Sequence, residues 1–169
     1  PCDVLVANTR AIVPGAVPAL LFGALSALGL RAQASAGLTW RLHGQLAELG
    51  LGGIEFEVLL RLARSAQGQL RMTDLAAQTG LSTSGVTRVV DRLEREGLAR
   101  RRACPTDRRS MFTVITGPGQ DRLAAVLPGH LDLIERWYTG LLSAEQLDGL
   151  TETLRTIRDA ARPGATAGA

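Results

Sequence analysis

One stretch of about 45 residues limits the fold more than any other part of the chain. Thr73 is a suitable N-cap for a short helix over 74–78, and a glycine turn follows. Ser82 can then cap a second helix from Thr83 to about Glu96, which Gly97 would end in the left-handed conformation. Two short helices joined by a turn that contains glycine are typical of a helix-turn-helix.

Two strands are predicted directly after the second helix, over 98–103 and 111–115. In the second strand alternate residues share a face, with Met111, Thr113 and Ile115 on one side. The connecting segment contains Pro105 and Asp107, which favour a turn. The pattern predicts a β-hairpin, or wing, with Arg108 and Arg109 at its tip.

Positive charge is concentrated in the same stretch. The chain has 169 residues and a net charge of +3, from 19 basic and 16 acidic residues, and every basic residue is arginine. Eight of the arginines lie in the 22-residue window 88–109, which has only four acids. Such a patch favours a polyanionic partner, nucleic acid first. The alternative is a solvated helix face with ion pairs, for example between Arg92 and Glu96 at i,i+4 spacing.

Helices are predicted on both sides of this stretch. On the N-terminal side they cover 38–50 and 54–64, and Leu70-Arg71 can form a short strand. On the C-terminal side one helix is expected over 119–142, with a kink at Pro128. A capping box from Ser143 to Gln146 begins the last helix, and its apolar stripe consists of Leu147, Leu150, Leu154 and Ile157.

Residues 11–30 carry no charge, and 20 apolar residues are roughly enough to span a bilayer. A membrane-tethered or exported helical binding protein is therefore one alternative. Pro14, Gly15 and Pro18 interrupt the tract, however, which favours a buried interface helix. The expected division is an apolar N-terminal segment, a first dimerisation helix, a winged DNA-binding lobe, two C-terminal dimerisation helices and a flexible tail. These parts cover residues 1–30, 31–52, 53–117, 118–161 and 162–169.

The predicted fold class is mainly α with a small β wing. Hydrophobic residues make up 46% of the chain, which fits a folded globule, and the 4% aromatic content disfavours a β-sandwich. Cys2 and Cys104 are too far apart in sequence for a disulfide framework or a cysteine zinc site. His43 and His130 are the only histidines, and neither has a metal-ligand partner at suitable spacing. We expect no catalytic residue, no metal and no cofactor.

The order of these elements and their motifs resemble the MarR family of bacterial transcription regulators. The resemblance spans roughly residues 38–160 and is carried by four segments: 75–82, 89–98, 107–109 and 115–119. It implies a cytoplasmic homodimer, formed by the N- and C-terminal helices, that binds double-stranded DNA at a pseudo-palindromic operator. We therefore expect a regulator, most simply a repressor, and no membrane association.

Recognition helices present their N-terminal residues to base edges. Here these are Thr83, Ser84, Thr87 and Arg88. The helix N-terminus favours phosphate, so Ser82 is expected to anchor the backbone. The full expected DNA-contacting set is Ser82, Thr83, Ser84, Thr87, Arg88, Arg92, Asp107, Arg108 and Arg109. The resemblance places Arg109 in the minor groove with Asp107 as its orienting acid, although Asp107 is also an ordinary turn residue. For Arg100–Arg102 only general phosphate attraction is expected, because strand alternation turns some of them away.

Two alternative signals could release the protein from DNA: binding of a small molecule or oxidation of a thiol. The resemblance implies a small phenolic or aromatic acid, and Trp40, Arg41 and His43 are candidates because arginine pairs carboxylates and tryptophan supplies an aromatic wall. The alternative is that Trp40 belongs to the core and the other two are solvated. Thiol oxidation at Cys104 is the second trigger, since nearby arginines lower a thiol pKa. Against it, Cys104 is equally explained as a small residue at a strand end.

Overall fold

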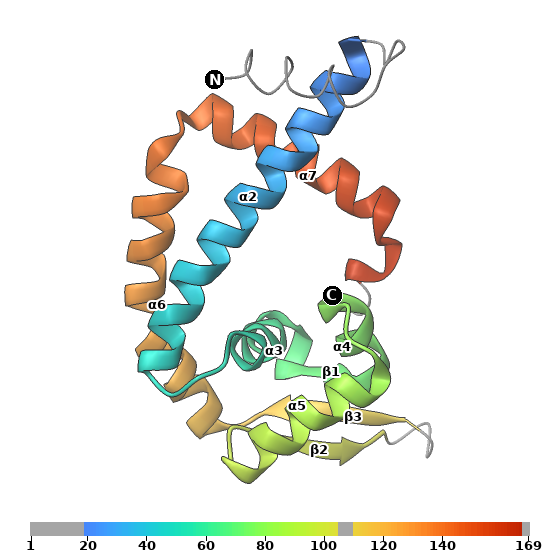
Figure 1. The fold of residues 1–169 in the computed structure, drawn as a ribbon. Helices are drawn as coiled ribbons and strands as arrows, with labels where there is room; N and C mark the ends of the chain where they lie inside the picture. The colour runs from blue at the N-terminus through green and yellow to red at the C-terminus, as the bar shows by residue number, and fades with distance from the viewer. Residues whose placement is uncertain (1–18, 105–109, 167–169) are drawn as a thin grey trace. The chain divides into compact units, whose positions relative to one another are not determined.

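The computed structural model describes residues 19–104 and 110–166 (Figure 1). The chain divides into two compact units, 1–40 and 41–169, and the winged lobe belongs to the second. The helices are α2 (Ala19–Glu48), α3 (Gly53–Arg64), α4 (Met72–Thr79), α5 (Thr83–Arg95), α6 (Gly117–Trp137) and α7 (Ala144–Ala161). The strands are β1 (Gln69–Arg71), β2 (Ala99–Ala103) and β3 (Met111–Ile115). Short 3-10 turns cover Ala66–Gly68, Thr139–Leu141 and Pro163–Thr166. The chain is thus mainly helical with one small sheet, as predicted.

The capping signals around the second short helix are confirmed. The Ser82 Oγ accepts a hydrogen bond from the backbone N–H of Gly85 at 3.1 Å, so Ser82 is the N-cap of α5. Gly97 has φ +72°, the left-handed conformation predicted for the residue that ends this helix. The predicted cap of the first short helix is wrong. α4 begins at Met72 with Arg71 as its N-cap residue, because β1 leads directly into the helix and leaves Thr73 inside the first turn.

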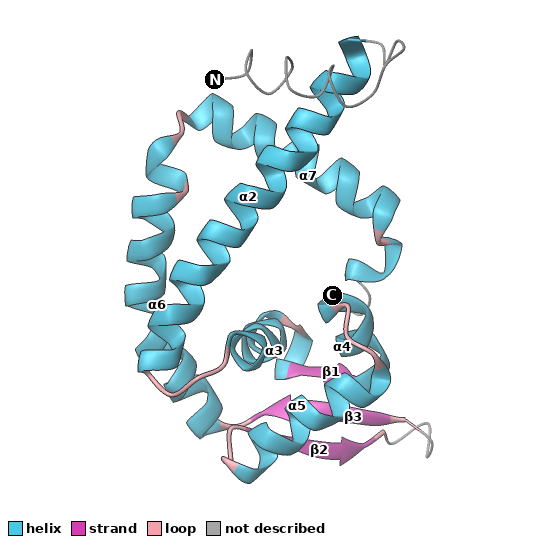
Figure 2. Ribbon diagram, viewed as in Figure 1, coloured by secondary structure: helices cyan, strands magenta, loops and turns pink. Residues whose placement is uncertain are grey.

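The three strands form an antiparallel sheet in the order β1-β3-β2 (Figure 2). Thr113 in the central strand pairs with Leu70 on one side and Arg101 on the other. Thr113 and Ile115 are buried, which confirms the predicted alternation, and Met111 is exposed at the end of the same face. The short strand predicted at Leu70-Arg71 supplies the third member of the sheet.

The core lies in the winged lobe, between α3, α4, α5 and the sheet. α5 contributes Val86, Val90 and Leu93, each fully buried, and Val89 packs against them partly buried. Burying side chains of this size is worth about 1.5–3 kcal/mol each. Further fully buried members are Val58, Leu59, Leu62 and Leu75. Val86, Val90 and Leu93 turn one face of α5 into the core, so the opposite face is left for solvent.

The N-terminal helix includes parts of both the apolar segment and the expected first dimerisation helix. α2 is continuous from Ala19 to Glu48 and crosses the boundary expected between residues 30 and 31. Gly23 and Gly29 are accommodated inside it. Leu25, Leu28 and Leu30 are more than half exposed. No helix within 19–104 and 110–166 is long and apolar enough to cross a membrane, and the first part of the uncharged tract, residues 11–18, lies outside the described residues.

The C-terminal part differs from the prediction at two places. α6 stays helical on both sides of Pro128 but ends at Trp137 rather than Leu142, and a 3-10 turn leads to the last helix. The capping box is confirmed: the Ser143 N–H donates to Gln146 Oε1 at 2.9 Å, and the Gln146 N–H donates to Ser143 Oγ at 3.3 Å.

The second difference is the tail, which was expected to be flexible from residue 162. Instead Arg162 donates from Nη2 to the backbone oxygens of Ala77 and Gln78, at 2.9 and 3.4 Å. Residues 163–166 follow as a 3-10 turn against α4. The reason is long-range: the last carbonyls of α4 need donors, and the guanidinium supplies them.

Candidate nucleic-acid interface

α5 presents a polar face at its N-terminal half. Thr83, Ser84 and Arg88 are exposed there and Thr87 is half-buried, because Val86 and Val90 turn the opposite face into the core. The Thr87 hydroxyl donates to the Thr83 carbonyl at 2.9 Å. The helix N-terminus adds a partial positive charge to this end. Four of the predicted contact residues therefore share one exposed surface.

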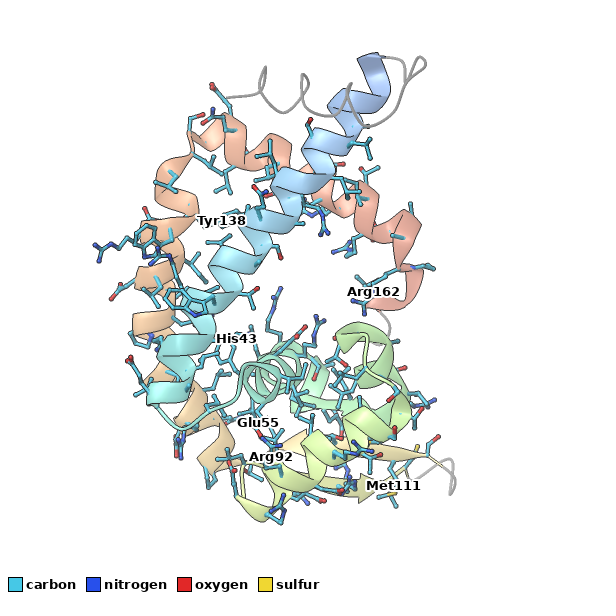
Figure 3. The ribbon with its side chains drawn as sticks, in the orientation of Figure 1. His43, Glu55, Arg92, Met111, Tyr138 and Arg162 are labelled. Atoms are coloured by element: carbon cyan, nitrogen blue, oxygen red, sulfur yellow. The ribbon has the colours of Figure 1, made fainter. Side chains whose placement is uncertain are left out.

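Arg92, one of the expected DNA contacts, pairs with an acid of another helix. Its Nη1 lies 2.7 Å from Glu55 Oε1 (Figure 3), and not beside Glu96, which the alternative of a solvated helix face offered as an example. Glu55 is buried, at 3% exposure, and its other oxygen accepts the Gly52 N–H at 2.7 Å to cap α3. A buried carboxylate requires a partner. Arg92 supplies it and so joins α5 to α3, while its own side chain stays half exposed.

Arg101 fastens the wing to the same helix. Its Nη1 lies 2.7 Å from Asp91 Oδ1 and also contacts the Glu94 carboxylate, and its backbone N–H donates to Glu94 Oε1 at 2.6 Å. A further hydrogen bond reaches the Thr87 carbonyl at 3.2 Å. We did not predict this cluster. The signal was present as two acids at i,i+3 spacing, which lie on one face of a helix.

The ion pairs determine which arginines in residues 88–109 can still pair with a negatively charged partner. Two arginines are neutralised by acids, and Arg102 donates to the Gln69 amide. Within the described ranges, no carboxylate lies within 4.0 Å of Arg88, Arg95, Arg100 or Arg102. Arg88, Arg95 and Arg100 are exposed. The solvent side of α5 and the wing is therefore positively charged, as a polyanion partner requires.

A cleft of about 370 Å³ lies between the start of α4, α5 and the wing strands. Thr83 and Thr87 line it from α5, and Arg101 and Asp91 close one side. Arg71 and Thr73, which were not among the predicted contacts, line it from the start of α4. Helix N-termini and arginines are common phosphate partners. The polar surface thus extends beyond the recognition helix to the helix before it.

The tip of the wing, with the predicted contacts Asp107, Arg108 and Arg109, lies outside the described residues. At the base of the hairpin the Cys104 N–H donates to the Ser110 carbonyl at 3.0 Å. Cys104 is buried, at 5% exposure. An oxidant reaches a buried thiol poorly, so this geometry favours a packing role over redox sensing.

None of the three candidate ligand residues lines the cleft beside α5 or the cleft between α3, α4 and α7. Trp40 is 75% exposed, so it is not a core residue either. The Arg41 guanidinium carbon lies 3.8 Å from the Trp137 ring centroid, a cation–π contact. Burial lowers the pKa of the His130 imidazole, and the exposed His43 lowers it further. The His130 and Phe56 rings pack together, with their centroids 4.4 Å apart.

A helix-turn-helix with a three-stranded wing and an uncompensated basic face defines a winged helix-turn-helix DNA-binding protein. No cluster of three potential metal ligands occurs among residues 19–104 and 110–166. Comparison with known proteins gives the family. The MarR family model matches residues 49–110, and the HTH-type transcriptional regulator MhqR of Bacillus subtilis is 34% identical over 108 residues. That alignment covers 64% of this chain and 72% of MhqR.

Solved structures agree with this assignment. AbsC, a MarR family transcriptional regulator from Streptomyces coelicolor, is 32% identical and superposes with a TM-score of 0.78, covering 82% of this chain and 94% of AbsC. Sco3205 from the same organism, solved in complex with DNA, is 31% identical with the same TM-score and covers 82% and 91%. The chain belongs to the MarR family of DNA-binding transcriptional regulators. Its homologues are regulators, not enzymes.

Proposed function

We propose that the protein acts as a homodimeric repressor that reads a pseudo-palindromic operator with α5 in the major groove of each half-site. The observation that carries the proposal is the two-sided character of α5: one face is fully buried, and the other exposes hydroxyls and a guanidinium beside a positively charged wing. A helix of this kind fits the major groove, whose base edges offer donors and acceptors.

The contacts divide into two kinds. Base edges or nearby phosphates are contacted by Thr83, Ser84, Thr87 and Arg88. The N-terminus of α5 at Ser82 contacts the DNA backbone. Arg92, also in the expected set, is paired with Glu55 and supports the recognition face by holding α5 against α3. At the wing, Arg109 enters the minor groove with Asp107 as its orienting acid, and Arg108 contacts phosphate. Arginine suits the narrow minor groove better than lysine does.

Selection of bound duplexes from a random pool tests this proposal first. We expect a two-fold symmetric site with half-sites about one helical turn apart. Gel-shift titrations on that site then compare Arg88→Ala and Arg109→Ala with Arg155→Ala, which removes the same charge from exposed α7. Each of the first two should weaken binding about 5- to 150-fold, equivalent to about 1–3 kcal/mol, and leave melting unchanged. Equal affinities for all three variants, or an affinity independent of salt, would overturn the assignment.

We also propose that a small phenolic or aromatic acid releases the DNA. Two solved relatives of the same fold support a ligand of this class: NadR is in complex with 4-hydroxyphenylacetate, and DNA binding by BpsR of Bordetella bronchiseptica is regulated by 6-hydroxynicotinic acid. Trp40, Arg41 and His43 are the proposed ligand residues. In gel shifts, either acid should release the operator from the wild type and should do so less effectively with Arg41→Ala. Unchanged DNA binding at millimolar acid argues against this ligand class.

A further inference from the structure

A second cleft, remote from the recognition helix face, lies between α3, the end of α4 and the end of α7. It encloses about 520 Å³, within the range of small-molecule sites. Its charged lining consists of four arginines and one glutamate: Arg61, Arg64, Arg158, Arg162 and Glu57. Leu60 and Ala165 supply apolar surface, and no aromatic side chain lines it. The cleft is therefore strongly positive.

Part of this charge is already compensated. The Glu57 carboxylate accepts from Arg61 at 2.6 and 3.1 Å, and Arg158 pairs with Asp159 at 2.8 Å. For Arg64 and Arg162, no carboxylate of the described chain lies within 4.0 Å. Two guanidinium groups thus face a concave site without a negative counterpart. A ligand with more than one negative charge would be held best there.

The cleft is also connected to the DNA-binding unit. Arg61 Nη1 donates to the side-chain oxygen of Gln78 at 3.2 Å, and Gln78 is 5% exposed. Arg162 holds the last carbonyls of α4, at Ala77 and Gln78 (Figure 3). α4 is the helix against which α5 packs. An anion that recruits these guanidinium groups would alter the hydrogen bonds at the end of α4, and through α4 the position of the recognition helix.

We propose that this cleft is an effector site for a small organic anion with at least two carboxylate or phosphate groups. The site is separate from the residues assigned above to the aromatic acid. Binding exchanges the contacts of Arg162 with neutral carbonyls for contacts with a charged ligand. The absence of an aromatic wall disfavours ligands that depend on ring stacking.

Calorimetric titration of the full chain at low ionic strength, without DNA, tests this site directly. The probes are citrate and inorganic pyrophosphate, which separate carboxylate from phosphate ligands, with acetate at matched ionic strength as the monoanion. We expect saturable binding of at least one probe, one per chain, and none of acetate. No saturable binding of either probe would overturn the proposal.

Variants place the binding in the cleft. Arg64→Ala should weaken binding at least tenfold, and its exposed position makes folding of the variant secure. Arg155→Ala, on α7 but outside the cleft lining, and Arg88→Ala, on the recognition helix, should stay within twofold. If all three variants lose affinity equally, or if Arg88→Ala loses most, the probe binds by net charge or at the DNA surface and the proposal is wrong. Because no DNA is present, this result is independent of the operator experiments.

Discussion

Single residues join elements that are far apart in the chain, and Glu55 is the clearest example. Its carboxylate caps α3 through the Gly52 N–H and pairs with Arg92 of α5. The local half of this arrangement is an i,i+3 contact typical of a helix start. The other half depends on α3 and α5 packing together, which no local pattern encodes.

Glu55→Gln should therefore destabilise the fold. The amide oxygen can still accept the Gly52 N–H, but the charge that faces Arg92 is lost. We expect a loss of about 1–3 kcal/mol in the free energy of unfolding, measured by urea titration with circular dichroism. Arg95→Ala, an exposed position on the same helix as Arg92, should stay within about 0.5 kcal/mol. A Glu55→Gln protein as stable as the wild type would show that the ion pair contributes no net stability.

His130 gives stability a pH dependence. Burial, and secondarily His43, lower the pKa of its imidazole, so the folded state prefers the neutral ring. The unfolded chain then binds more protons, and stability is full above about pH 6.5 and falls as the pH drops through the lowered pKa. Melting between pH 7.5 and 5 should show a smaller decline for His130→Gln than for the wild type. His43→Gln should retain most of the decline, because the buried imidazole remains. Parallel curves for wild type and His130→Gln would refute this source of the dependence.

At the scale of elements, the start of α6 lies close against the backbone at the end of the α5–β2 turn. A Cβ on Gly119 would lie 2.0 Å from the Leu98 carbonyl oxygen. The Thr116 Oγ accepts from the Gly119 N–H at 3.1 Å and donates to the Gly97 carbonyl at 2.6 Å, which fixes this junction. The segment 115–119 is part of the resemblance to the MarR family, and the geometry shows what its last glycine does.

Gly119→Ala should cost about 1–3 kcal/mol of unfolding free energy, because the methyl group forces two backbones apart. Gly117→Ala is the matched control: it lies at the start of the same helix, and its added Cβ meets nothing within 4 Å. Thermal melting of the two variants should therefore separate clearly, with Gly117→Ala close to the wild type. If both variants melt together, the close approach at Leu98 does not limit stability.

At the scale of the whole molecule, α7 has the apolar stripe that the sequence predicted, but none of its residues is buried. Leu147 and Leu150 are half-buried, whereas Leu154 and Ile157 are 38% and 52% exposed. An amphipathic helix with an uncovered apolar side favours burial against a second copy. This surface supports the proposed dimer.

Light scattering coupled to size exclusion should give twice the 17.9 kDa mass of one chain. Replacing Leu154 and Ile157 together with glutamate should shift the protein to the monomer mass and abolish cooperative operator binding, because charge would be buried at the interface. Thr153→Glu, on the exposed side of the same helix, should leave the dimer intact. A monomeric wild type at micromolar concentration would rule out the dimer.

The sequence by itself determined the elements of the winged lobe and their approximate limits. Ser82, Gly97 and the Ser143–Gln146 capping box act on neighbours within four residues, and the alternation in β3 depends on strand geometry alone. Such short-range interactions can be inferred from spacing. The concentration of arginines from 88 to 109 was also visible in the sequence, and it favoured a polyanionic partner over the alternative of a solvated helix face.

Only the tertiary structure decided which arginines remain available to a partner. Arg92 and Arg101 are neutralised by acids, Arg162 is drawn to the end of α4, and Arg88 stays on the exposed face. The Arg92 and Arg162 contacts join residues 37 and about 85 positions apart, so their partners depend on how the helices pack. Charge can be counted along a chain, but whether it is compensated depends on distances that exist only after folding.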